Sequence, residues 1–85
     1  MKYRKRPVII DAIQWTGTTE SYKAIVELSQ PDTRRIILKL ATNELFVSTL
    51  EGVLAAPMNA YIVKGVQGEV YAVKEDIFNQ TYERV

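Results

Sequence analysis

Residues 61–73 read YIVKGVQGEVYAV, two runs of β-branched and aromatic residues separated by Gln67-Gly68. Runs of this kind favour β-strands, and a glycine between them can adopt the positive φ that a tight turn requires. The stretch therefore predicts an antiparallel hairpin. It also makes antiparallel pairing the organising feature of the chain.

Further short strands precede this hairpin. We expect them at residues 35–41, 45–50 and 53–56, with turns at the positions where Asn, Gly and Pro interrupt the apolar runs. Together with the hairpin they predict a β-meander over residues 35–73. Residues 7–15 (PVIIDAIQW) predict one more strand, whose apolar residues on both faces are typical of a central or bulged strand.

A helix is predicted between the first strand and the meander, over residues 19–29. Tyr22 and Ile25 begin an apolar stripe with the spacing of a helix face. Thr19 is the residue type that caps helix N-termini, and Pro31 ends the segment because the residue before a proline is driven out of the helical region.

These elements predict one domain, because 85 residues are too few to form two separate cores. The expected order is a basic leader (1–6), a strand (7–15), the helix (19–29), the meander (35–73), and a short helical turn with a tail (75–85). The predicted class is α+β, a small, strongly bent or barrel-like antiparallel sheet of about six short strands with one helix packed on it.

The residue types exclude several chemistries. The chain contains no His and no Cys, which rules out imidazole-assisted nucleophilic catalysis and the usual zinc sites. Glu75-Asp76 is typical of a solvated helix start. Asp11, inside an apolar strand, is expected either to lie at an edge of the sheet or to form a salt bridge, with Arg34 or Arg35 as the partner considered. We therefore predict a protein that is not an enzyme, with no catalytic residue, cofactor or metal.

Charge and hydropathy indicate which partners and which cellular compartment to expect. Eleven Lys and Arg stand against ten Asp and Glu, and so small a basic excess argues against a dedicated nucleic-acid binder. No apolar run approaches the ~20 residues that a membrane span needs. Nothing in the opening residues resembles a secretory signal, and the absence of Cys fits a reducing compartment. We expect a cytoplasmic protein without a membrane partner.

Basic and aromatic side chains supply the candidate contacts to a partner or ligand. The leader could follow a phosphate backbone with its tyrosine stacked on a base, or it could simply keep the edge of the first strand soluble. The other aromatic residues suit either a core or an interface. The full candidate set is Lys2, Tyr3, Arg4, Arg6, Trp15, Tyr61, Lys64, Tyr71 and Lys74.

Two stretches resemble a known family. They are MKYRKRPVIIDAIQW (1–15) and AYIVKGVQGEVY (60–71), the latter followed by KEDIF (74–78) and TYE (81–83). They resemble the start and end of a family of small, uncharacterised bacteriophage and prophage proteins, and together they cover roughly half of the chain. The resemblance implies a phage origin but no assigned activity.

The chain departs from the family pattern at residues 58–60. Family members tend to have Pro-Gly-Asp there, whereas this chain has Met-Asn-Ala. Asn59 is then expected to supply the turn, because asparagine tolerates the left-handed region. Residues 16–57 are not matched closely, which leaves room for a function specific to this chain.

The leading hypothesis is a non-enzymatic phage-type accessory protein that binds a host protein in the host cytoplasm. One alternative is an oligomeric binder of a nucleotide signal in counter-defence, with Lys64, Lys74 or the leader's cations on phosphates. Another is a weak nucleic-acid-binding accessory protein that uses the leader. A homo-oligomer is also considered, because self-association adds buried area to a small domain.

Overall fold

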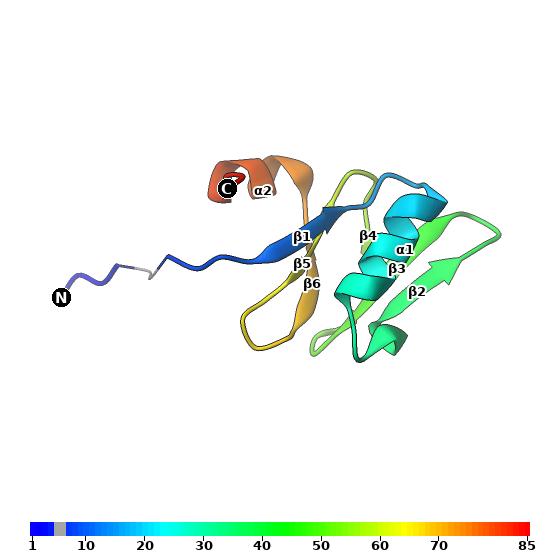
Figure 1. The fold of residues 1–85 in the computed structure, drawn as a ribbon, viewed down its shortest axis with the longest axis horizontal. Coiled ribbons are helices and arrows are strands. Elements are labelled where there is room, and N and C mark those ends of the chain that lie inside the picture. The colour runs from blue at the N-terminus through cyan, green and yellow to red at the C-terminus, as the bar shows by residue number, and fades with distance from the viewer. Residues whose placement is uncertain (5–6) are drawn as a thin grey trace.

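The structure is a computed structural model that describes residues 1–4 and 7–85. Six strands, two α-helices and one 3₁₀ helix follow one another along the described chain (Figure 1). They are β1 (Asp11–Gln14), α1 (Thr19–Leu28), the 3₁₀ helix η1 (Thr33–Arg35), β2 (Ile36–Lys39), β3 (Glu44–Thr49), β4 (Gly52–Ala56), β5 (Tyr61–Lys64), β6 (Val70–Val73) and α2 (Glu75–Thr81).

The predicted α+β class and the six strands are confirmed. The strands, however, form two three-stranded antiparallel sheets, ordered β1-β5-β6 and β2-β3-β4, and not one bent or barrel-like sheet. The meander is divided because the chain leaves the second sheet after β4 and pairs β5 with β1. Asn59, at φ 70°, lies in the turn that makes this crossing, as expected from its sequence.

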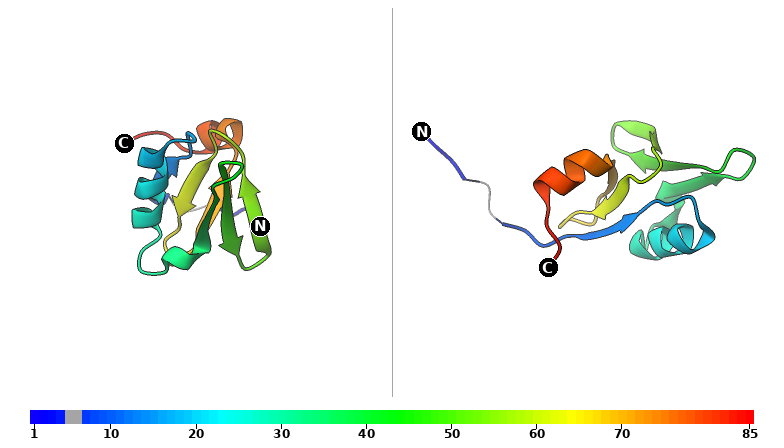
Figure 2. Two further views of the ribbon diagram at one scale, coloured as in Figure 1. Left: turned by 90° about the vertical axis from the view of Figure 1, so that its right-hand side faces the viewer. Right: turned by 90° about the horizontal axis from the view of Figure 1, so that it is seen from above.

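One apolar core lies between the sheets and α1. The helix contacts both β1 and β2 and so spans the two sheets on one side; Figure 2 shows it beside them. Every strand except β1, together with α1 and the residue that follows β1, supplies buried side chains. These are Trp15, Ile25, Ile36, Leu45, Val47, Ala56, Ile62 and Val70. The single core is what fixes the two sheets relative to each other.

The helix predicted over residues 19–29 is present as α1, but its cap differs from the prediction. Thr18, not Thr19, is the N-cap. The Thr18 hydroxyl accepts a hydrogen bond from the Ser21 backbone N–H at 3.1 Å, and the Ser21 hydroxyl accepts one from the Thr18 N–H at 3.3 Å. This reciprocal pair satisfies two backbone donors at the helix start. Glu20 lies in the first turn, where its charge suits the helix dipole.

The first strand is shorter than the predicted 7–15. Only Asp11–Gln14 pair with β5, since β5 ends opposite Asp11 at Lys64. The hairpin closes just beyond, where the Gly65 N–H donates to the Glu69 carbonyl at 2.8 Å. Val8–Ile10 therefore have no strand opposite them, and this N-terminal segment runs away from the domain (Figures 1 and 2).

The C-terminal helical turn is longer than expected. It forms a second α-helix, α2, of seven residues, where a single turn was predicted over residues 75–79. Glu75 and Asp76 occupy its first turn, where carboxylates interact favourably with the helix N-terminus. Within the described part of the chain, neither helix is long and apolar enough to cross a membrane.

Candidate functional site

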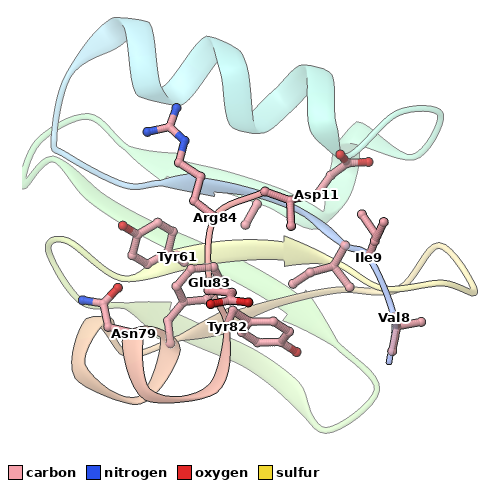
Figure 3. A pocket seen from close by; sticks show the side chains of 12 residues that line it. Val8, Ile9, Asp11, Tyr61, Asn79, Tyr82, Glu83 and Arg84 are labelled. Carbon is pink, nitrogen blue, oxygen red and sulfur yellow. The ribbon is translucent and has the colours of Figure 1, made fainter. Parts of the chain in front are cut away.

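A groove of about 490 Å³ separates the N-terminal segment from the C-terminal end of the chain. Figure 3 shows residues from β1, β5, α2 and the tail converging on it. Its lining consists of Val8, Ile9, Ile10, Asp11, Ala12, Tyr61, Phe78, Asn79, Tyr82, Glu83, Arg84 and Val85. We call this the terminal groove, because only Tyr61 comes from the middle of the chain.

Three aromatic rings form a row along the terminal groove. The rings of Tyr61 and Phe78 are stacked, with centroids 3.9 Å apart and planes 10° from parallel. Tyr82 follows, with its centroid 4.9 Å from that of Phe78 and a tilt of 32°. Tyr82 is the C-cap residue that directly follows α2, and its backbone N–H donates to the Phe78 carbonyl at 2.9 Å. All three side chains are half-buried, so each keeps some surface for a ligand.

A side chain that the sequence did not single out holds α2 in place. The amide nitrogen of Gln14, in β1, donates to the Asn59 carbonyl at 3.0 Å and to the Glu75 carboxylate at 2.9 Å. One glutamine therefore links β1, the crossing turn and the first turn of α2. Nothing in the local sequence marks this role, because a single Gln in a strand is also typical of solvent-facing positions.

Charged residues belong to the lining of the terminal groove as well. Asp11, Glu83 and Arg84 are among the lining residues; in Figure 3 the side chain of Glu83 lies beside Tyr82, whereas those of Asp11 and Arg84 point away from the rings. All three residues are exposed. The terminal groove thus combines an apolar floor with one carboxylate, that of Glu83, beside the aromatic row.

Among the described residues no ion pair links Asp11 to Arg34 or Arg35; Asp11 instead lies on β1, an edge strand, which is the other position considered for it. Both arginines lie near Asp32, with Nε–Oδ distances of 3.2 Å for Arg34 and 3.6 Å for Arg35. The hydrogen bond from Arg34 lowers the pKa of the Asp32 carboxyl below its usual value. Sequence proximity decides this pairing, since Asp32 stands only two and three residues before its partners.

A second, smaller groove of about 190 Å³ lies on the side of the sheets opposite α1, between β4 and β6. Tyr71 and Lys74, both predicted contacts, line it together with Leu54. Leu54 is 49% exposed although it pairs with the fully buried Val47, because no element covers this side of the core in the described chain. Burial and the nearby Tyr82 hydroxyl raise the pKa of Tyr71.

The structure does not gather the predicted contacts into one site. Tyr61 lies in the terminal groove, whereas Tyr71 and Lys74 lie in the second groove. The ammonium group of Lys64 donates a hydrogen bond to the Gln30 carbonyl at 2.8 Å. Trp15 is 1% exposed and belongs to the core, so its side chain offers nothing to a partner.

The remaining candidates lie in the leader. Lys2, Tyr3 and Arg4 are exposed on the N-terminal stretch, which runs away from the rest of the domain in Figure 1, and none of them lines either groove. Arg6 lies outside the described residues. The candidate contacts did not include Phe78 and Tyr82, because only a single helical turn was predicted there; their spacing of four residues would have been the signal had a longer helix been expected.

Among residues 1–4 and 7–85, no three acidic side chains lie close enough together to hold a metal ion. Comparison with known proteins adds no further assignment: no family model matches the chain, and no curated protein or solved structure matches it significantly.

Proposed function

We propose that this protein is a non-enzymatic binding module whose terminal groove receives an extended segment of another protein. The observation that carries the proposal is the row of Tyr61, Phe78 and Tyr82 along that groove. Aromatic side chains dominate the energetics of protein interfaces, because they bury a large area with few rotatable bonds.

The dimensions of the terminal groove support this proposal. Its volume of about 490 Å³ lies inside the range of roughly 300–1,000 Å³ that is usual for binding pockets. The groove is bounded by two chain segments, Val8–Ala12 and Tyr82–Val85. A short extended peptide fits such a shape better than a compact small molecule does.

The charge beside the rings indicates the kind of partner. Glu83, beside the aromatic row, favours a segment that carries a basic residue next to its apolar side chains. A nucleotide is disfavoured here because its phosphates would meet the Glu83 carboxylate. Lys64 and Lys74, the cations proposed for phosphate binding, are absent from this lining.

The resemblance to phage proteins supports a host protein as the partner. It covers residues 1–15, 60–71, 74–78 and 81–83, which contribute every lining residue except Asn79, Arg84 and Val85. In this proposal the protein is a phage-type accessory factor that acts in the host cytoplasm.

Affinity capture from bacterial lysate, with and without infection, tests the proposal. Wild-type protein is compared with Glu83→Arg, which reverses a charge at the groove rim, and with Glu51→Arg, which makes the same change at the exposed β3–β4 turn. We expect a host protein retained in near-equal molar amount by wild type and Glu51→Arg, and at least tenfold less by Glu83→Arg.

Mass spectrometry of the small molecules and nucleic acids on the same resin provides the opposite outcome. Retention of a nucleotide or a nucleic acid without any stoichiometric protein would overturn the proposal. So would a protein that binds wild type and Glu83→Arg equally. Circular dichroism and thermal melting of the three proteins establish that each is folded.

A further inference from the structure

We propose that two copies of this chain pair through the N-terminal segment, with Val8–Ile10 of one copy lying antiparallel to Val8–Ile10 of the other. Val8, Ile9 and Ile10 also line the terminal groove, so a second copy and a host segment would share this stretch of the chain. The inference rests on an unfinished strand, on its exposed apolar side chains, and on the distribution of charge around it.

The first observation is the unfinished strand. β1 pairs with β5 only up to Asp11, because β5 turns away at Gly65. The chain before Asp11 stays extended and continues the line of β1 beyond the sheet (Figure 1). Within the described residues, no backbone hydrogen bond involves Val8, Ile9 or Ile10. Unpaired, extended backbone of this kind is a template for another strand.

The second observation is the composition of the segment. Val8 is 48% exposed and Ile9 82% exposed. β-branched side chains favour the extended conformation, so pairing would cost little backbone entropy and would bury apolar area now in water. Pro7, which lacks a backbone donor, stands at the end of the run and marks where hydrogen bonding would stop.

The distribution of charge favours a second copy as the occupant. If the two segments cross at Ile9, antiparallel pairing sets Val8 opposite Ile10 and Pro7 opposite Asp11. Lys2 and Arg4 precede Pro7 and are exposed. They would then run along the partner beyond Asp11.

Acidic side chains line the partner's surface there. Asp11 and Glu27 border a shallow groove between β1 and α1, and Glu83 stands on the rim of the terminal groove. The contact between the cations of one copy and the acidic side chains of the other would occur twice, because an isologous interface repeats each contact by symmetry. Parallel pairing would instead place the two sets of cations side by side, which costs electrostatic energy. Each copy thus supplies the cations for one of these contacts and the acidic side chains for the other.

Sedimentation equilibrium on the full chain, over about 10–500 µM, tests the inference. The wild type should approach twice the 9.7 kDa mass of one chain. Ile9→Pro removes the backbone donor and should weaken association at least tenfold, whereas Ile9→Thr, which keeps the donor and the β-branch, should weaken it less. Ile9 is outside the core, so both variants should melt like the wild type.

Reversal of a charge in the leader provides an independent test of the same inference. Arg4→Glu should weaken the dimer several-fold, and salt near 1 M should reduce the difference from wild type, because the Debye length falls to about 3 Å. The matched control is Lys39→Glu, on the exposed edge of the other sheet. A wild-type chain that stays monomeric over the whole range, or a dimer unaffected by Ile9→Pro, would overturn the inference.

Discussion

The ring of Tyr61 lies nearly flat on the ring of Phe78, with 3.9 Å between the centroids. The contact joins β5, in the middle of one sheet, to α2, which has no buried residue of its own. A seven-residue helix is too short to be stable alone in water, so its conformation depends on such tertiary contacts. The same stack therefore stabilises α2 and forms the floor of the terminal groove.

Phe78→Ala should lower the free energy of unfolding by about 2 kcal/mol, from the loss of apolar burial and of the aromatic pair. The midpoint of thermal unfolding should fall by roughly 10 °C. Ile77→Ala is the control, because Ile77 is the neighbouring residue and is 49% exposed. Equal losses in the two variants would mean that the stack contributes nothing specific.

Substitution of two adjacent threonines, Thr18 and Thr19, should show which of them caps α1. Thr18→Ala deletes the hydroxyl that accepts from the Ser21 N–H and should cost about 1 kcal/mol of stability. Thr19→Ala, one residue later and already inside the helix, should change stability by less than about 0.5 kcal/mol. Urea unfolding of both variants measures the difference, and the reverse order would place the cap at Thr19.

The N-cap of α1 shows why sequence patterns predicted the position of a helix or strand better than they predicted its exact ends. The stripe that begins with Tyr22 and Ile25 predicted α1 to within a residue, because helical spacing repeats over several turns. The cap depends on one reciprocal hydrogen bond, and Ser21 occupies the position where Glu or Gln usually signals it. Thr18 and Thr19 carry the same hydroxyl, so the residue type alone could not distinguish them.

The division into two sheets depends on contacts that no local pattern records. Residues 7–10 have the composition of a strand, yet they remain unpaired because β5 ends at Lys64. The candidate site shows the same limitation. Tyr61 was predicted as a contact from its type, whereas the stack on Phe78 arises only when α2 folds back onto β5. Trp15, the largest aromatic residue of the chain, proved to be core.

Substitution of Asn59 should reveal the cost of its backbone conformation. At φ 70° a β-carbon is strained, and asparagine tolerates this better than alanine does. Asn59→Ala should destabilise the protein by about 1 kcal/mol, and Asn59→Gly should be nearly neutral, since glycine has no β-carbon. Thermal unfolding of the two variants provides the measurement. A more stable Asn59→Ala than Asn59→Gly would contradict the expectation.

The ionisation of Tyr71 should be delayed in the folded protein. Burial, followed by the Tyr82 hydroxyl, raises its pKa above the ordinary value near 10. The folded state therefore binds this proton more tightly than the unfolded state does. The resulting stability is present below about pH 10 and is lost as the pH rises through the folded-state pKa.

Absorbance near 295 nm follows tyrosinate formation during an alkaline titration. The wild type should show a late-titrating tyrosine that disappears in Tyr71→Phe, and its unfolding free energy should decline more steeply above pH 10 than that of the variant. Tyr22→Phe serves as the control, because Tyr22 lies on α1, on the other side of the core. A late titration that persists in Tyr71→Phe would assign the shift to another tyrosine.

The pairing of β1 with β5 also constrains how the protein is made. On the ribosome β1 emerges early, while its only strand partner lies far toward the other end of the chain. Strands β2, β3 and β4 pair with their neighbours in sequence and can assemble as soon as they appear. The segment from Val8 to Trp15 therefore remains exposed to water through most of translation. During that interval the nascent chain is at its most vulnerable to aggregation and offers chaperones their most accessible hydrophobic target.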